Sequence, residues 1–460
     1  MRSIYRGLLM SAVLTTGVAA WAQDSKPALP LIPSTPAKEI EDKKAEEKKP
    51  AKKLTEQEEA ELEYKKYQEA QQKALQEMAK LASHKQSGEV KVIGSDKTSK
   101  LQTLTLTADN RVLALVAPPR GYGAPVKGAT AEVQVFDAEG KKLDTWKVSF
   151  HAHSINAAAD GTVYVAGDGK VARFDKDGKA IGEAMELPHI TEMFKDKDSL
   201  RKKAEETLKA QKAQREETMK AARKQFEATI KKVEEIKEEE RTKAQTRQLQ
   251  QAKDILKAYD QMEKQEGTQT VESVIQSMTG RVRIINGIAV SEKDVFITCG
   301  ESAGYGYAVW RFDRDLKNPK QILKGLGGCC GQMDVQVSGS DVVMAENTKH
   351  QFAKYDRNGE KLGSFGKRGT DADPACFGGC CNPMNTRAAG GSGDIYTAES
   401  EGVVKRFSAT GAFIGVAATV KIEGGCKNVA IGVSTDGDKI VFCDQPGSKF
   451  FILTKKPEGK

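Results

Sequence analysis

"MDVQVSGSDVVMAENTKHQFAKYDRNGEKLGSFGKRG", residues 333–369, holds four short runs of apolar and β-branched residues separated by turn-forming residues. Runs of this length are typical of β-strands, and the Asn-Gly pair at 358–359 favours a tight hairpin turn. Short strands joined by tight turns pair as an antiparallel meander. The stretch therefore predicts one four-stranded β unit.

The same pattern recurs along the chain, with a "VYVAG"-type strand, a later strand that commonly ends in Phe or Tyr plus Asp, and a glycine turn. The other copies are 101–148, 154–187, 285–323, 384–417 and 427–456. Six such units stacked radially form a β-propeller. The last copy ends after its third strand, so we expect "GEVKVIG" (88–94) to supply the fourth strand. The sequence predicts an all-β six-bladed propeller of four-stranded antiparallel blades.

One segment carries a family resemblance. "YDRNGEKLGSFGKRGTDADPACFGGCCNPMNTRAAGGSGDIYTAES" (355–400) resembles the repeat of NHL-type six-bladed propellers, over roughly 88–194 and 280–455 of this chain. The resemblance implies a protein that binds partners or ligands, with a minority of enzymes in the family. One enzyme group of that family, the peptidyl-hydroxyglycine lyases, relies on metal-binding histidines. This chain has only five histidines in all, which does not support that activity.

The first residues predict export. A basic start, an apolar stretch and Ala20-Trp21-Ala22 form a secretory signal peptide over 1–22, so we expect a periplasmic or secreted protein. An uncleaved membrane anchor is the alternative for this segment. Residues 23–54 are rich in Pro, Lys and Glu and predict a disordered tether. No later stretch is apolar enough to predict a transmembrane span after signal cleavage.

Two segments without Gly or Pro, 55–83 and 195–266, predict long helices. They indicate an N-terminal helix over 55–86 and a helical insertion over 195–279, between propeller segments 88–194 and 280–460. Apolar residues at three-four spacing over 195–266 predict a coiled-coil hairpin that bends within 237–247. This arm is expected to dock a protein partner or to self-associate, and a solvated spacer is the alternative.

The formal net charge of +8 suggests nucleic acid as a partner at first sight. Lys and Glu alternate along the helices, however, and no aromatic-studded basic strand or recognition helix accompanies the charge. The sequence therefore predicts no nucleic-acid binding.

The eight cysteines are expected on one face of the propeller, because strand direction alternates within a meander. They lie in loops that lead into blades or at the ends of second strands: Cys299, Cys329, Cys330, Cys376, Cys380, Cys381, Cys426 and Cys443. Three hypotheses remain open for them. An exported protein favours disulfides; soft thiolates could hold a metal or cluster; a reactive thiol or redox pair is the third.

A polar position recurs where blades two to six begin, and it predicts a binding site at the mouth of the central channel. Its members are Asn156, Asn286, Asp334, Asn385 and Asn428. Beside it, "HAH" sets two imidazoles on one side of an extended segment. The candidate metal ligands there are His151, His153, Cys329, Cys330, Cys380, Cys381 and Cys426, for a thiolate-bound metal of unknown identity.

No serine-nucleophile elbow, phosphate-binding loop or zinc-protease motif occurs in the chain. The leading hypothesis is a non-enzymatic binding scaffold that uses the cysteine-bearing face and the coiled-coil arm. The alternative is a metal-dependent or thiol-redox enzyme with its site at the channel mouth.

Overall fold

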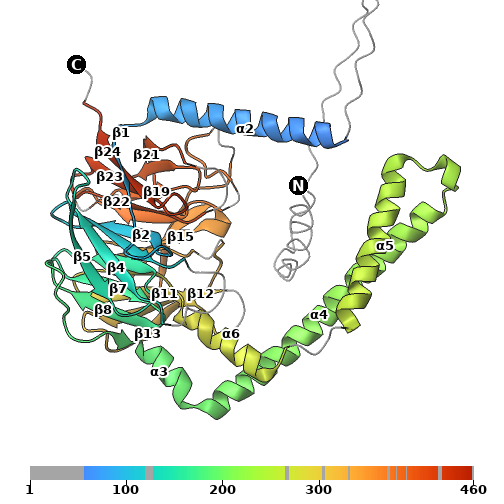
Figure 1. Cartoon of the computed structure of the whole chain (residues 1–460), viewed down its shortest axis with the longest axis horizontal. Helices are drawn as coiled ribbons and strands as arrows, with labels where there is room; N and C mark the ends of the chain where they lie inside the picture. Colours follow the sequence, from blue (N-terminus) through green and yellow to red (C-terminus); the bar gives the residue numbers. More distant parts are fainter. Residues whose placement is uncertain are drawn as a thin grey trace, which may run out of the picture. The chain divides into compact units, whose positions relative to one another are not determined.

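The computed structural model describes residues 56–119, 128–264, 269–302, 306–329, 332–369, 373–379, 381–389, 391–422 and 427–457 (Figure 1). The predicted signal peptide and tether lie outside the described residues. So do Cys330, Cys380 and Cys426.

The described strands form six four-stranded antiparallel sheets, which confirms the predicted six-bladed propeller (Figure 1). Blade 1 consists of β2 (Lys100–Leu106), β3 (Val112–Ala117), β4 (Ala131–Phe136) and β5 (Lys142–Val148). Blade 2 consists of β6 (Ser154–Ala157), β7 (Val163–Gly167), β8 (Lys170–Phe174) and β9 (Met185–Glu186). Blade 3 consists of β10 (Ile285–Val290), β11 (Asp294–Gly300), β12 (Tyr307–Asp313) and β13 (Lys320–Leu326). Blade 4 consists of β14 (Val335–Ser338), β15 (Asp341–Glu346), β16 (Gln351–Tyr355) and β17 (Lys361–Phe365). Blade 5 consists of β18 (Asn385–Ala388), β19 (Ile395–Ala398), β20 (Val403–Phe407) and β21 (Phe413–Thr419). Blade 6 consists of β22 (Val429–Val433), β23 (Lys439–Asp444), β24 (Lys449–Lys455) and β1 (His84–Lys91).

The blades close into a ring. Their first strands contact one another in the order β2, β6, β10, β14, β18, β22 and back to β2. Strand β1 pairs antiparallel with β24, as the prediction for residues 88–94 required, but it begins at His84. His84 is buried, and its Nε2 lies 2.8 Å from the Gly437 carbonyl oxygen. The predicted helix over 55–86 therefore gives way to strand, and α2 spans Glu56–Leu81.

Apolar side chains fill the space between neighbouring blades. Strands β3 and β11 are buried along their whole length, because each is covered on both faces. Such strands read as continuous apolar runs, as "VLALVA" does in β3. A shared cluster joins blade 1 to blade 2 through the stacked rings of Trp146 and Phe174. The core of this protein therefore lies mainly between its sheets.

The recurrent glycine turn has a structural explanation. In blade 2, Asp175 Oδ1 accepts hydrogen bonds from the backbone N–H groups of Asp177 and Lys179, and Gly178 has a φ of +83°. A Cβ at Gly178 would overlap the indole of Trp146, on the outer strand of blade 1. The turn requires glycine both for its left-handed conformation and because the preceding blade leaves no space.

Blade 3 departs from this rule at Leu316, which has a φ of +66° and is buried in the cluster between blades 2 and 3. The outer strand of blade 2, β9, has only two residues because the chain leaves the blade for the helical insertion. Leu316 packs in the same apolar cluster as Met185 of this short strand. The exception therefore lies beside the place where the chain leaves blade 2 for the insertion.

The insertion comprises helices α3 (Pro188–Lys195), α4 (Lys197–Glu234), α5 (Lys243–Lys264) and α6 (Val271–Arg283), with a 3-10 turn η1 (Glu238–Glu240). It extends beyond the predicted 195–279 at both ends, because its flanking helices pack on the propeller. Ile190 of α3 and Val282 of α6 are buried in the cluster between blades 2 and 3. Helix α6 contacts α3 and β11 (Figure 1).

Residues 205–270 contain most of α4 and all of α5, form a helical hairpin, and belong to a different compact unit from the propeller. Its chain turns at 235–242, at the start of the predicted bend. Val233, Leu249 and Ala252 are buried, and the rings of Phe226 and Tyr259 lie 6.3 Å apart. These residues belong to the apolar stripes that predict the hairpin.

Two further helical features complete the fold. A 3-10 turn, η2 (Asn347–Lys349), joins β15 to β16. The end of α2 packs on blade 5, where Met78 and Ala82 contact the apolar cluster of Val403 and Val416. Among the described residues, no helix is both long and apolar enough to cross a membrane.

Candidate functional site

The five polar positions predicted for the channel mouth all lie at the start of a blade. Asn156 lies in β6 and Asn286 in β10, Asn385 begins β18, and Asp334 and Asn428 directly precede β14 and β22. The five positions do not share one register, however. Asn385 pairs with Ala398 of the second strand, whereas Asn156 pairs with Tyr164, the counterpart of Tyr396, and Asn428 lies before the first pair of β22.

Two of these side chains tie one blade to the next. Asp334 of blade 4 accepts a hydrogen bond of 2.8 Å from the Thr386 N–H and lies 3.2 Å from the guanidinium of Arg387. Burial raises the pKa of the Asp334 carboxyl, and the Arg387 charge opposes that rise. Asn385 of blade 5 accepts a hydrogen bond from the Ile431 N–H of blade 6. Both residues stabilise the ring.

Two amides reach across to more distant blades. The Asn156 amide lies 3.4 Å from Gln336 Oε1 of blade 4, and Gln332 donates to the Val429 carbonyl oxygen of blade 6. Gln332 Oε1 and Asn428 Oδ1 are buried acceptors without a hydrogen-bond partner among the described residues. Polar side chains at the starts of the blades thus hydrogen-bond to one another across the ring. Two buried acceptors there can still bind water or a ligand.

The described cysteines lie in the loops and strand ends where they were predicted. Cys329 precedes β14, Cys376 and Cys381 precede β18, and Cys299 and Cys443 lie near the ends of β11 and β23. Cys299, Cys376 and Cys443 are free thiols. The disulfide framework stays a prediction, because Cys330, Cys380 and Cys426 lie outside the described residues.

The two histidines of "HAH" lie side by side, with ring centroids 4.5 Å apart. His151 Nε2 donates a hydrogen bond of 2.8 Å to the Pro118 carbonyl oxygen. In the part of the chain that the structure describes, no three or more His, Cys, Asp or Glu residues form a metal-binding group. The metal hypothesis therefore still depends on residues that are not described.

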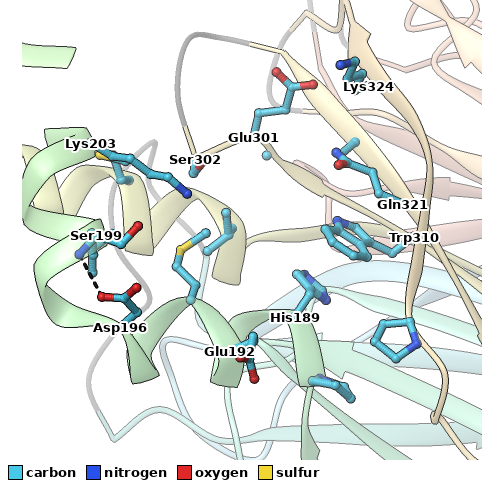
Figure 2. Close-up of a pocket in the computed structure, with 18 residues that line it drawn as sticks. His189, Glu192, Asp196, Ser199, Lys203, Glu301, Ser302, Trp310, Gln321 and Lys324 are labelled. Atoms are coloured by element: carbon cyan, nitrogen blue, oxygen red, sulfur yellow. Dashed lines mark hydrogen bonds between the residues drawn. The ribbon is translucent and has the colours of Figure 1, made fainter. Parts of the chain in front are cut away.

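The structure contains a groove that the sequence did not predict (Figure 2). It has a volume of about 690 Å³ and lies between the flanking helices of the insertion and blade 3. Its walls come from α3, the first turns of α4, α6, and the strands β12 and β13. We call it the blade 3 groove.

One wall of the blade 3 groove is aromatic. The imidazole of His189 stacks on the indole of Trp310, with ring centroids 4.2 Å apart and an interplanar angle of 11°. Met193 and Met278 also line the groove. Thioethers adapt to irregular ligands and make favourable contacts with aromatic rings. This wall favours a flat apolar group as ligand.

His189 also contacts a cysteine, with 3.8 Å between its Nε2 and Cys299 Sγ. Burial lowers the pKa of His189 to about 4. Burial, with a smaller effect of Glu301, raises the pKa of the Cys299 thiol to about 12. Reactive cysteines require the opposite arrangement, a thiolate stabilised beside a cationic imidazole. The pair is therefore neutral at pH 7 and acts in packing.

The acidic and basic side chains that line the groove (Figure 2) differ in whether they have partners within the protein. Its three carboxylates have partners within the protein: Glu192 pairs with Lys195, Asp196 accepts from the Ser199 N–H, and Glu301 accepts from the Gly325 N–H. Lys203 and Lys324 are exposed, and neither has an ion-pair partner among the described residues. The two ammonium groups are thus available to a ligand.

The sequence held only a weak signal for this groove. "PHITEMF" (188–194) falls within the predicted propeller segment 88–194, although Pro at the first helical position is typical of a helix start. The helix has eight residues, which is too few for a clear amphipathic period. Trp310 and His189 are also far apart in the sequence, so their stacking depends on the folded insertion.

A second unpredicted feature is a buried ion pair in blade 5. Lys405 Nζ lies 2.6 Å from Glu399 Oε1, and the two side chains are 1% and 5% exposed. The same ammonium donates to the Cys376 carbonyl oxygen and lies 5.2 Å from the centre of the Phe377 ring. Burial raises the pKa of Glu399 to about 7, although the Lys405 charge acts in the opposite direction.

We expect the thiols of Cys299 and Cys443 to be inert in the folded protein. Both are buried, and burial raises the pKa of each. Alkylation by iodoacetamide, followed by peptide mass spectrometry, should be at least about a hundredfold slower in native than in unfolded protein. Equal rates would contradict this expectation. Labelling of the unfolded protein only after reduction would instead show that the cysteine is in a disulfide.

Comparisons with known proteins give little beyond the fold. No protein-family model matches the chain, and no curated protein matches it. The WD40 domain of Pan2 from Neurospora crassa is similar in structure, with a TM-score of 0.41 and 9% identity, over 82% of this chain and 97% of that chain. A protein of unknown function from Bacteroides thetaiotaomicron gives a TM-score of 0.42 and 10% identity, over 82% and 74%. At such values these likenesses carry no argument about function.

Proposed function

We propose that this chain is a non-enzymatic binding scaffold of the periplasm or the extracellular space. The observation that carries the proposal is the blade 3 groove, in which an aromatic wall lies beside two lysines without ion-pair partners among the described residues. A concave site with an apolar lining and a few polar groups is typical of ligand binding. The inserted helices would thus add a binding site to the propeller.

Two finer points belong to this proposal. The propeller is proposed to be of NHL type, which the Asp-x-x-Gly turns at Asp175 and Asp356 support. A superposition on NHL propellers that left these turns out of register would contradict it. The hairpin of residues 205–270 is proposed to dock a protein partner or a second copy. Its helices are rich in charged residues, so such a partner would need complementary charges.

The alternative, a thiol-redox or metal-dependent enzyme, receives less support from the geometry. The described contact between a thiol and an imidazole, Cys299 with His189, is neutral and buried. A thiolate nucleophile or a thiolate metal ligand would need a lowered cysteine pKa. The enzyme hypothesis would therefore have to rest on the channel mouth.

Photo-crosslinking in the exported protein tests the proposal. A benzophenone amino acid is placed at Gln321 in the groove, at Lys231 on the hairpin, and at Leu362 as a control. Leu362 is 55% exposed on β17, the outer strand of the next blade, which matches the position of Gln321 on β13. We expect adducts at Gln321 and Lys231, on a chain whose mass places its first residue at Gln23.

Different outcomes refute different parts of the proposal. Adduct yields at Gln321 that do not exceed those at Leu362 would remove the groove as a binding site. The same result at Lys231 would remove only the docking role of the hairpin. A chain that retains residues 1–22 in the exported fraction would contradict the predicted signal cleavage.

A further inference from the structure

We infer that the blade 3 groove binds an aromatic carboxylate, which inserts its ring beside Trp310 and presents its anionic group to Lys203 and Lys324. This inference rests on the proposed binding function and names the ligand class of the same site. It follows from the shape of the groove, its aromatic wall and its two lysines without ion-pair partners among the described residues.

The groove has room for such a ligand. Its volume of about 690 Å³ lies within the range of roughly 300–1,000 Å³ found for small-molecule sites. Helix α3 supplies the His189 ring and β12 the Trp310 ring that form the aromatic wall. Aromatic pairs favour offset or edge-on contacts, to which the sulfurs of Met193 and Met278 can add.

Two lysines of the groove favour an anionic group in the ligand. Each carboxylate of the groove is already held within the protein, by a backbone N–H group or by Lys195. Neither lysine of the groove has an ion-pair partner in the described part of the chain. Lys203 comes from α4 and Lys324 from β13, so the two ammonium groups lie on the two walls (Figure 2). The two ammonium groups would attract an anionic group of a ligand, while Asp196 and Glu301 keep their own negative charge.

Two kinds of ligand carry an aromatic ring and a carboxylate in this arrangement. One is a small aromatic acid, and the other is the carboxyl end of a peptide whose last residue is aromatic. Both combine one ring with one carboxylate a few bonds away. They differ in whether more chain precedes the ring, which a titration can distinguish.

The fluorescence of Trp310 provides the measurement. The chain has three tryptophans; Trp21 lies in the predicted signal peptide, and Trp146 is buried against Phe174 in another blade. The mature protein is titrated with 3-phenylpropionate and with its neutral amide. We expect a saturable change with both, with binding of the acid at least about tenfold tighter, which corresponds to about 1.4 kcal/mol. The Trp310→Phe variant should lose the signal.

Two double variants isolate the role of charge. In K203M/K324M the preference for the acid should fall to nearly one, while the amide still binds. In the matched control K202M/K320M, which changes exposed lysines of the same helix and strand outside the groove lining, the preference should persist. N-acetyl-Gly-Phe with a free carboxylate completes the series. Tighter binding than phenylpropionate indicates a peptide terminus, and weaker binding a small acid.

The outcomes separate this inference from the proposed function. Equal binding of acid and amide, or a preference that survives K203M/K324M, would overturn the inference while leaving the groove a binding site. No binding of either probe at 10 mM, a concentration on the order of a very weak Kd, would overturn it too. Crosslinking at Gln321 would then still decide whether the groove binds another class of ligand.

Discussion

Gly178→Ala should lower the free energy of unfolding by about 3 kcal/mol, as overpacking adds to the strain of a non-glycine residue at positive φ. Gly178 has a φ of +83°, and its new Cβ would overlap the indole of Trp146. That indole cannot easily move, because it stacks on Phe174 and its Nε1 donates to Asp144. Chemical denaturation followed by circular dichroism measures the change.

Gly182→Ala is the matched control for this prediction. Gly182 has a φ of +74° in the same blade, and no heavy atom of the described residues lies within 4 Å of the position that a Cβ would take there. It should cost only about 1 kcal/mol, the typical penalty of a left-handed residue. If the two variants lose equal stability, the contact with Trp146 contributes nothing and the explanation of the recurrent turn is wrong.

The turn explains why the propeller was predictable from sequence. Each of blades 1 to 5 must place an acidic or hydroxyl side chain and a residue of positive φ at fixed spacing before its outer strand, so the requirement is local and repeats along the chain. The exception, Leu316, occurs next to the shortened strand β9. A local requirement of this kind can be recognised in the sequence without knowledge of contacts between distant residues.

The blade 3 groove could not be predicted in the same way. Trp310 lies in a strand whose alternation fits any blade, and His189 lies in a helix too short to show its period. Their stacking arises only because α3 and α6 fold back on blade 3. The channel-mouth residues illustrate the converse: Asp334 and Asn385 were identified by position, but their hydrogen bonds to neighbouring blades could not be derived from spacing.

The ion pair of blade 5 was not predicted either. Glu399 and Lys405 occur in "AESEGVVKRF" (398–407), which reads as a solvated turn and strand. Their burial depends on the Cys376 loop, whose carbonyl oxygen accepts from Lys405. Burial of charge is a tertiary property, so sequence patterns alone do not reveal it.

Lys405→Met should destabilise the protein by about 3–5 kcal/mol at pH 8, the usual effect of leaving one member of a buried ion pair without its partner. Without the Lys405 charge, and beside Glu401, the pKa of Glu399 should rise further, so at pH 8 the buried side chain is either an unpaired carboxylate or must take up a proton. At pH 5 the loss should be much smaller, because a protonated Glu399 carries no charge. Urea denaturation at both pH values measures the difference.

The wild-type protein should also lose stability as the pH rises from 5 to 8, because of Glu399. The pKa of Glu399 is raised from 4.5 to about 7 by folding, so its contribution to stability is full below pH 4.5 and is lost as the pH rises through 7. His189 acts in the opposite direction, because its pKa is lowered from 6.5 to about 4 and its contribution is lost as the pH falls through 4. Glu399→Gln should therefore remove the alkaline loss and leave the acid one.

A double variant tests whether the charges of Glu399 and Lys405 interact. Lys405→Met combined with Glu399→Gln leaves no buried charge, so at pH 8 its loss of stability should be smaller than the sum of the two single losses by about 1–3 kcal/mol. Lys80→Met, which breaks the exposed pair with Glu77, should change stability by less than about 0.5 kcal/mol and serves as the control. Additive losses in the double variant would mean that Glu399 and Lys405 stabilise blade 5 through packing, independently of each other's charge.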